Sequence, residues 1–252
     1  YSDSIGKFLP DKERPDEGVF SFKDENKWLS LRYDLTAPLA RYVAKNYLEI
    51  PKPFKRYQLG TVWRNEKPGP GRFREFLQFD ADFIGTKNLM ADAELCVMIS
   101  EILEKCGLDK KDYTIKWSTR KLTDALFEKL KISSSNKRLK ILRSLDKLDR
   151  LGWDEVKKLL GKGRKDKSGD FTEGAELSSS QIQDVYEIFV KKEVIPSGDN
   201  YEEGAGKDIR SMTNFLDVFG FKNYKFDPSI IRGLEYYTGP IFEVNLNFEV
   251  KN

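Results

Sequence analysis

The fold of this chain is decided by residues 54–83, which read FKRYQLGTVWRNEKPGPGRFREFLQFDADF. Residues 54–63 and 73–83 are rich in β-branched and aromatic side chains, which is typical of strands. Residues 68–71, Pro-Gly-Pro-Gly, separate the two arms, and such residues mark a turn. The pattern predicts two antiparallel strands joined by a long loop.

The second arm carries polar side chains at every second position. Phe76, Gln78, Asp80 and Asp82 are spaced by two, so a regular strand turns all four to one face. A face with one aromatic ring, one amide and two carboxylates is a poor core surface. The pattern therefore favours the floor of a pocket.

Arginines lie at both ends of the predicted loop. Arg64 and Glu66 follow the first strand, and Arg72 and Arg74 precede the second. Guanidinium groups in this arrangement suit a polyphosphate, because each gives two parallel charge-assisted hydrogen bonds. A charged surface ribbon, whose salt bridges contribute little, is the alternative. The residues alone leave both interpretations open.

Composition limits the possible chemistry. The chain has 252 residues, enough for one large domain or a domain with an insertion, and 44 Lys+Arg against 41 Asp+Glu give a net charge of +3. Contact with nucleic acid would therefore be local. Histidine is absent, which excludes histidine-based general-base catalysis and zinc sites built on histidine. Cys96 and Cys106 fit reduced residues of one helix, and no apolar run is long enough to cross a bilayer.

A hairpin and a helix are predicted before residue 54. Residues 19–22 and 28–33 read as strands, and a helix is expected to begin near Pro38. Thr36 is its candidate N-cap, and Asp34 lies just ahead of it as a partner of the helix dipole. A binding role for both residues at a strand end has equal weight at this point.

The middle of the chain reads as helical. Residues 89–107 form the clearest amphipathic helix, with an apolar stripe made of Leu95, Met98, Ile99, Ile102 and Cys106. A strand at 113–117 and a helix at 121–130 are predicted to follow.

Residues 131–207 are predicted to be a helical insertion. Helices are expected at 137–150, 154–160 and 181–192, with a loop at 161–169. Charge runs of this kind are usually solvent-exposed surface, and that is the first interpretation of its basic residues. The alternative is contact with nucleic acid through Lys137, Arg138, Lys140, Arg143, Lys162 and Arg164.

Residues 231–244, IRGLEYYTGPIFEV, form the last informative stretch. They follow a predicted helix at 208–219 and a predicted strand at 224–227. The pattern predicts a strand that turns Tyr236 and Tyr237 to opposite faces.

These motifs resemble those of a known family. Arg64-x-Glu66, the Gly/Pro loop and Arg72-x-x-x-Phe76 are similar to motif 2 of the class II aminoacyl-tRNA synthetases. The sequence RGLEYYTG at 232–239 is very similar to the histidine-binding signature of the histidyl-tRNA synthetases. Residues 31–44 are similar to the segment of that family that holds the α-amino group, and the resemblance spans nearly the whole chain.

The resemblance implies a role for each matching residue. For ATP these are Arg64 at the α-phosphate, Glu66 near the adenine amino group, Arg72 toward the γ-phosphate and Phe76 stacked on adenine. For histidine they are Asp34 and Thr36 at the α-amino group, Gln78 near the amino and carboxylate groups, Asp82 and Tyr237 at the imidazole nitrogens, and Tyr236 in the pocket wall. Arg232 matches the catalytic arginine, which acts with Arg64. Some members have Glu where this chain has Asp34 and Asp82.

The resemblance also implies a fold and an activity. The fold is α+β, an antiparallel sheet flanked by helices, with a catalytic core at 1–130 and 208–252 and a helical insertion at 131–207. Motif 3 and the anticodon-binding domain are expected to be absent, so the chain reads as a core fragment. The family uses ATP, with Mg²⁺ carried on it and no metal held by the protein, to join L-histidine to tRNA(His) in a cytoplasmic homodimer with no membrane contact.

Two alternatives remain. One is a non-catalytic relative with the same fold, either the regulatory subunit of ATP phosphoribosyltransferase or a domain that senses uncharged tRNA. Those relatives tend to lose ATP-contacting residues, whereas this chain retains Arg64, Glu66, Arg72, Phe76 and Arg232. The other is a threonyl or prolyl synthetase, which would require a different signature at 232–239.

Overall fold

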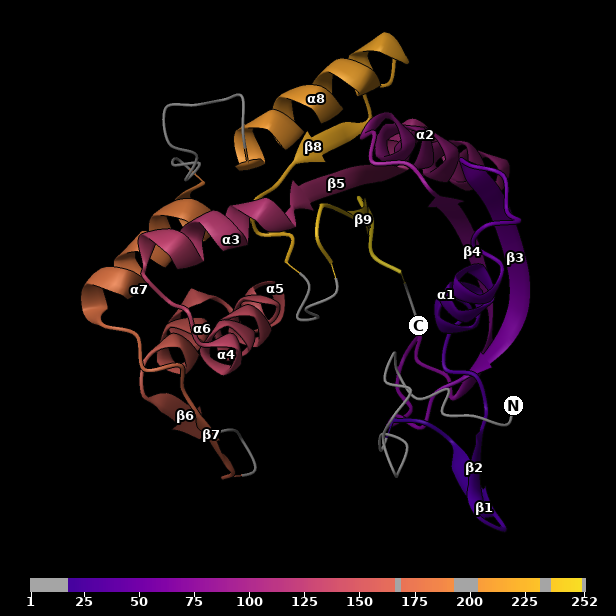
Figure 1. The fold of residues 1–252 in the computed structure, drawn as a ribbon. Helices are drawn as coiled ribbons and strands as arrows, with labels where there is room; N and C mark the ends of the chain where they lie inside the picture. The colour runs from indigo at the N-terminus through magenta and orange to yellow at the C-terminus, as the bar shows by residue number, and fades with distance from the viewer. Residues whose placement is uncertain (1–17, 166–168, 193–203, 232–236, 251–252) are drawn as a thin grey trace. The chain divides into compact units, whose positions relative to one another are not determined.

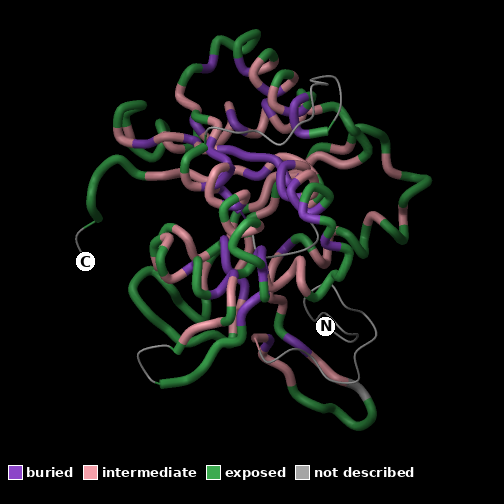
Figure 2. Tube along the Cα trace, turned by 90° about the vertical axis from the view of Figure 1, so that its left-hand side faces the viewer, coloured by how far each residue is buried: buried purple, intermediate pink, exposed green. Residues whose placement is uncertain are grey.

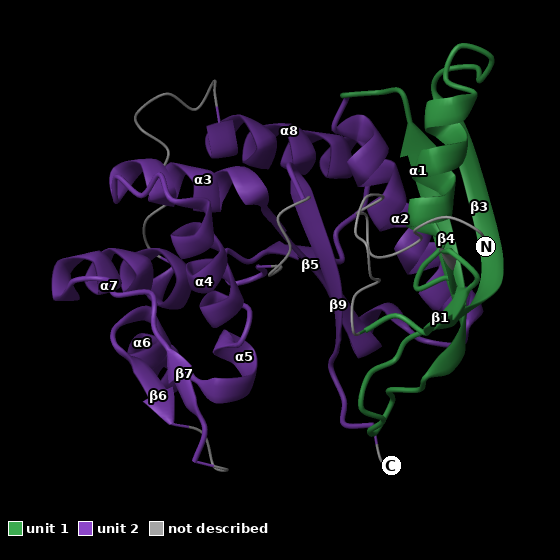
Figure 3. Ribbon diagram, turned by 60° about the horizontal axis from the view of Figure 1, so that its bottom comes forward, with its two compact units in different colours: residues 1–87, 251–252 green, residues 88–250 purple. Residues whose placement is uncertain are grey.

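A computed structural model describes residues 18–165, 169–192, 204–231 and 237–250 (Figure 1). The chain divides into two compact units, residues 1–87 with 251–252 and residues 88–250 (Figure 3).

Helices and short strands alternate irregularly along the chain. The strands are β1 (Ser21–Asp24), β2 (Lys27–Ser30), β3 (Phe54–Trp63), β4 (Glu75–Ile84), β5 (Tyr113–Thr119), β6 (Gly163–Lys165), β7 (Phe171–Glu173), β8 (Tyr224–Phe226) and β9 (Pro240–Leu246). The α-helices are α1 (Thr36–Lys45), α2 (Met90–Lys105), α3 (Arg120–Lys129), α4 (Ser135–Leu145), α5 (Leu148–Leu151), α6 (Trp153–Leu160), α7 (Ser179–Tyr186) and α8 (Gly204–Val218). This mixture confirms the predicted α+β class.

The first unit is built on the predicted hairpin. β3 and β4 pair antiparallel, from Phe54 opposite Ile84 to Trp63 opposite Glu75. The loop between them closes on a tight turn in which Gly71 has a φ of +66°, a conformation that favours glycine. Helix α1 lies beside β3 (Figures 1 and 3). The pocket between them, of about 230 Å³, is lined by Pro38, Leu39, Tyr42, Phe54, Arg56 and Gln58.

The second unit contains a three-stranded sheet in the order β8-β5-β9. β5 pairs antiparallel with β9 but parallel with β8. This sheet is therefore mixed, whereas a wholly antiparallel sheet was predicted. Every second residue of β5 points to the same face. On one face these residues are Tyr113, Ile115 and Trp117, which α2 and α8 cover. β5 is therefore a largely buried strand, and Figure 2 shows the buried parts of the described chain in purple.

The face of α2 that packs on β5 includes Ile99 of the predicted stripe but is otherwise formed by other residues. Ala93, Cys96 and Ser100 are its buried residues, whereas Ile102 and Cys106 are exposed. The Ser100 and Tyr113 hydroxyls lie 2.6 Å apart in a buried hydrogen bond. The stripe prediction was wrong in part, because the fully buried positions of the helix carry small side chains, which a pattern of large apolar residues does not identify.

The helices predicted to form an insertion share one hydrophobic core with α3. Leu126, Leu142, Leu160 and Val185 belong to this cluster, from four helices. The predicted helix at 137–150 is wrong, since it is divided into α4 and α5. The predicted loop at 161–169 is wrong at residues 163–165, where β6 pairs antiparallel with β7.

The end of the chain differs from its prediction as well. β9 begins at Pro240, so Tyr237 precedes the strand and has no regular structure. Arg232 and Tyr236 lie outside the described residues.

Asp92, in the first turn of α2, supplies a test of this packing. Burial raises the pKa of its carboxyl to about 6, and the charge of Asp208 adds to the effect. The folded state favours the protonated carboxyl, so the ionised carboxylate lowers the stability of the fold at pH values above its raised pKa. At pH values below the ordinary pKa of an aspartate, the carboxyl is protonated in both states and this cost disappears. We expect Asp92→Asn to raise the free energy of unfolding by about 1–2 kcal/mol near pH 7.5, with the gain largely lost near pH 4.

Urea unfolding at the two pH values measures this difference. Glu101→Gln, at an exposed position of the same helix, is the control and should change neither value. A gain from Asp92→Asn that is equal at both pH values would contradict the electrostatic cause.

Candidate functional site

The beginning of α1 joins the helix to the hairpin. Leu35 occupies the N-cap position without a side-chain cap, and Asp34 Oδ1 accepts a hydrogen bond of 2.9 Å from the Ala37 N–H. Thr36 is the first helical residue, and its Oγ1 donates to Asp80 Oδ2 at 3.3 Å. The prediction of Thr36 as the N-cap is therefore wrong. Asp34 satisfies the helix terminus, and Thr36 reaches across to β4.

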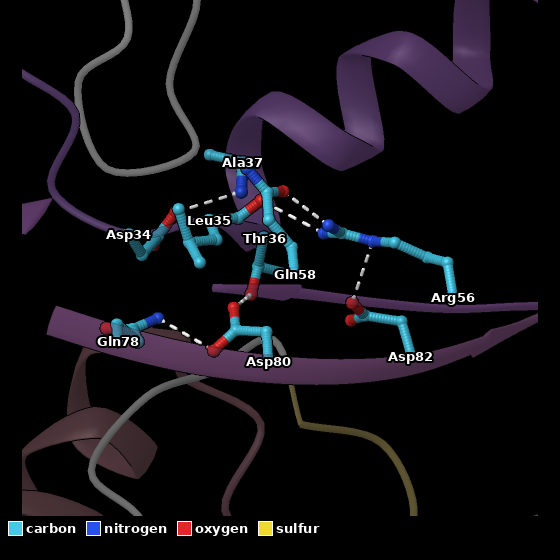
Figure 4. A network of polar contacts seen from close by, with 9 residues as sticks. All are labelled: Asp34, Leu35, Thr36, Ala37, Arg56, Gln58, Gln78, Asp80 and Asp82. Carbon is cyan, nitrogen blue, oxygen red and sulfur yellow. Dashed lines mark hydrogen bonds and ion pairs between the residues drawn. The ribbon is translucent and has the colours of Figure 1, made fainter. Parts of the chain in front are cut away.

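The polar row on β4 has the predicted orientation. Phe76, Gln78, Asp80 and Asp82 are all partly buried, whereas the alternating Leu77 and Phe79 are exposed. Gln78 Nε2 donates to Asp80 Oδ1 at 2.9 Å (Figure 4). The structure therefore presents one amide and two carboxylates on the face that also receives Thr36.

Arg64 leaves β3 and lies against this row. Its Nη2 donates to Gln78 Oε1 at 3.2 Å. The guanidinium carbon is 4.9 Å from the centre of the Phe76 ring and 4.7 Å from that of Tyr33. An arginine held between aromatic rings is restrained in orientation while it keeps its charge.

The mouth of the loop is fixed by Glu66. The Tyr33 hydroxyl donates to Glu66 Oε1 at 2.6 Å, and Arg74 Nε donates to the Glu66 carbonyl at 3.1 Å. Burial, together with the bond to Glu66, raises the pKa of Tyr33 to about 12. Arg72 lies exposed at the turn, where its backbone pairs with Gly69.

Carboxylates concentrate on this face. Burial raises the pKa values of Asp34 and Asp82, and the charge of Asp80 raises both further. The raised values show that these carboxylates lack full compensation for their lost hydration. Such a surface favours a ligand with positive charge or N–H donors, for example an ammonium group or an imidazole ring.

Arg56 is a member of this site that the sequence analysis missed. Its Nε lies 3.1 Å from Asp82 Oδ2, and the two side chains are only 14% and 19% exposed. The same guanidinium donates to Gln58 Oε1 and, at 3.4 Å, to the Leu35 carbonyl (Figure 4). The alternation that groups the β4 residues also places Arg56 and Gln58 on one face of β3, but the strand register was needed to identify their partners.

The signature residues belong to the second unit. Tyr237 is partly buried there, whereas Arg232 and Tyr236 lie outside the described residues. The predicted pairing of Asp82 with Tyr237 involves both units and stays a prediction.

Most of the basic residues considered for nucleic-acid contact have partners in residues 131–207 or in α3. Lys140 pairs with Glu173 at 2.7 Å, Arg164 pairs with Glu155 at 3.1 Å, and Arg138 lies over the Phe127 ring. Lys137 donates to the Glu176 carbonyl. Arg143 and Lys162 are exposed. These contacts agree with a structural role for the four engaged side chains, and contact with nucleic acid stays a prediction.

Within the part of the chain that the structure describes, no group of three His, Cys, Asp or Glu side chains is arranged to hold a metal ion. None of the helices described there has the length and apolar character needed to cross a membrane.

Comparison with known proteins gives one consistent family. A family model described as histidyl-tRNA synthetase matches residues 2–247. The histidine–tRNA ligase of Brucella ovis is 47% identical over 268 residues, which cover 100% of this chain and 53% of the relative. That of Bartonella henselae is 48% identical over 269 residues, covering 100% of this chain and 54% of the relative. The chain spans about half the length of these relatives.

Solved structures support the fold. Histidyl-tRNA synthetase from Nostoc sp. PCC 7120 superposes with a TM-score of 0.69 and 24% identity, covering 90% of this chain and 52% of that chain. A Bacillus halodurans C protein described as an ATP phosphoribosyltransferase regulatory subunit/histidyl-tRNA synthetase gives a TM-score of 0.68 and 21% identity, covering 94% of this chain and 59% of that chain.

The electrostatic coupling on the β4 face is testable through Asp80. Because its charge raises the pKa values of Asp34 and Asp82, Asp80→Asn is expected to lower both. Titration of the side-chain carboxyl carbons by NMR measures the change. Asp24→Asn, at an exposed position of β1, is the control and should leave both pKa values in place. Unchanged or higher values in Asp80→Asn would contradict the coupling.

Proposed function

Because the chain belongs to the histidyl-tRNA synthetase family, we propose that it forms the catalytic core of an enzyme that activates L-histidine with ATP and transfers it to the 3′ end of tRNA(His). The observation that carries the proposal is the single face of the β3–β4 hairpin. On that face Arg64 and Phe76 lie next to Gln78, and Gln78 is hydrogen-bonded to the carboxylate that also accepts from Thr36. Groups suited to a nucleotide and groups suited to an amino acid are thus adjacent.

In this proposal the nucleotide lies at the loop end of the face. Arg64 binds the α-phosphate, Phe76 stacks on adenine, Glu66 lies near the adenine amino group, and Arg72 reaches the γ-phosphate. The stacking of Arg64 between Tyr33 and Phe76 supports its part, since the guanidinium is oriented before ligand arrives. Mg²⁺ arrives with ATP and offsets the charge of the outer phosphates.

In the same proposal, histidine lies at the end of the β3–β4 face that carries Asp80 and Asp82. Asp34 and Thr36 take the α-amino group, and Gln78 lies near the amino and carboxylate groups. Asp82 and Tyr237 read the two imidazole nitrogens, and Tyr236 completes the wall. A pocket that hydrogen-bonds both ring nitrogens rejects amino acids without them, because its buried polar groups would be left without partners.

The reaction requires alignment of two anions. The histidine carboxylate attacks the α-phosphate, the bond to pyrophosphate breaks, and a terminal ribose hydroxyl of the tRNA then attacks the resulting anhydride. Arg64 and Arg232 neutralise the charge that develops at the α-phosphate. The protein contributes positioning and fixed charge, and no covalent intermediate with a side chain is needed.

The arrangement of the chain is part of the proposal. Residues 1–130 and 208–252 contribute to the catalytic core, and residues 131–207 are its helical insertion. In this proposal the enzyme acts in the cytoplasm as a homodimer.

A regulatory relative is the second candidate. The Bacillus halodurans C protein, whose description includes an ATP phosphoribosyltransferase regulatory subunit, shares the fold. The contacts between Arg64, Phe76 and Gln78 favour the enzyme, since a regulator that binds histidine has no need of an oriented phosphate-binding arginine.

Histidine-dependent exchange of pyrophosphate into ATP separates the two candidates. In the complete protein that contains these residues, we expect exchange in the wild type and a loss of about 10²–10³-fold in Arg64→Ala, the scale for one preorganised charge-stabilising donor. Lys23→Ala, on the exposed β1 strand, should retain the wild-type rate. Histidine binding without exchange would favour the regulator, and full activity in Arg64→Ala would remove Arg64 from the mechanism.

A further inference from the structure

The guanidinium of Arg56 connects two parts of the candidate amino-acid site. It contacts Asp82 on β4 at 3.1 Å and the Leu35 carbonyl at 3.4 Å, and it donates to Gln58 on its own strand. Figure 4 shows all three contacts made by the end of one side chain. A rigid planar fork is suited to holding several acceptors at fixed separations.

Those contacts involve the elements at opposite ends of the proposed histidine site. Leu35 lies between Asp34 and Thr36, the residues proposed for the α-amino group. Asp82 is the residue proposed for the imidazole ring. The distance between amino-binding and ring-binding groups is therefore set in part by one arginine, within one unit of the chain.

We infer that Arg56 is a positioning residue for histidine selection, which orients the Asp82 carboxylate and fixes its separation from the start of α1. This inference rests on the proposed function. Arg56 acts through Asp82 and need not touch the substrate.

The charges around Asp82 explain why a cation is needed there. Burial and the neighbouring Asp80 both disfavour its ionised form, and Arg56 opposes them. Without the guanidinium, a largely buried carboxylate would lose its charged partner. It would then rotate toward water or take up a proton, and in either state it would accept a ring N–H less well.

The test measures KM for histidine, KM for ATP and kcat in the exchange assay. For Arg56→Met we expect KM for histidine to rise by about 10–100-fold, the scale for removing the charged partner of a partly buried carboxylate. KM for ATP should stay within about twofold. Arg56→Lys, which keeps the charge without the fork, should recover part of the loss and serves as the informative variant if Arg56→Met does not fold. Arg41→Met, at an exposed position of α1, is the control.

A double-mutant cycle with Asp82→Asn separates positioning from general destabilisation. Because Arg56 is inferred to act through the Asp82 charge, Arg56→Met should change histidine affinity by at most about twofold in the Asp82→Asn background. Titration calorimetry provides the dissociation constant where exchange is too slow. Equal losses in both backgrounds, a parallel rise in KM for ATP, or an unchanged KM for histidine would overturn the inference.

The outcome also separates this inference from the proposed function. A wild-type protein that exchanges pyrophosphate, with Arg56 variants that bind histidine normally, would refute the role of Arg56 alone. A wild-type protein that binds histidine without pyrophosphate exchange would refute the proposed enzymatic activity. The double-mutant cycle, measured as dissociation constants for histidine, would still test the positioning role of Arg56. Absence of both binding and exchange would refute both.

Discussion

The burial of like charges on the β3–β4 face is the constraint on which the first unit depends. Asp34, Asp80 and Asp82 are partly buried close enough to influence one another's ionisation. Such an arrangement persists only where donors compensate for lost hydration. Thr36 and Gln78 donate hydrogen bonds to Asp80, and Arg56 forms an ion pair with Asp82. The compensation is incomplete, because the pKa values of Asp34 and Asp82 remain raised, and this leaves the face electrostatically suited to a cationic ligand.

The same network explains how the short helix α1 is held. None of its own residues is fully buried, and apolar packing at its start comes from the N-cap residue Leu35. Polar contacts add to that packing: Asp34 accepts from the helix terminus, Thr36 donates across to β4, and Arg56 donates to the Leu35 carbonyl. Groups proposed to bind substrate thus also hold the helix, and a change at any of them will affect both stability and recognition.

Part of the site could be predicted from the sequence, because alternation along a strand is a local property. The shared face of Phe76, Gln78, Asp80 and Asp82 follows from the two-residue repeat of a strand, and it can be predicted without knowing which strand pairs with β4. The pairing of Arg56 with Asp82 depends on register, which the loop decides. A hairpin closed symmetrically on the Gly69–Arg72 turn would place Arg56 opposite Gly85, but the loop is asymmetric and Arg56 faces Asp82. The packing face of α2 was predicted only in part for a related reason, since it depends on contacts with β5 and α8.

The central claim is that one face of the β3–β4 hairpin binds both reactants. A crystal structure of the complete protein with a non-hydrolysable analogue of histidyl-adenylate tests it most directly. The account predicts the phosphate-like group within hydrogen-bonding distance of Arg64, the adenine on the Phe76 ring and an imidazole N–H at the Asp82 carboxylate. An analogue bound away from this face, or bound with Asp82 turned from the ring, would contradict it.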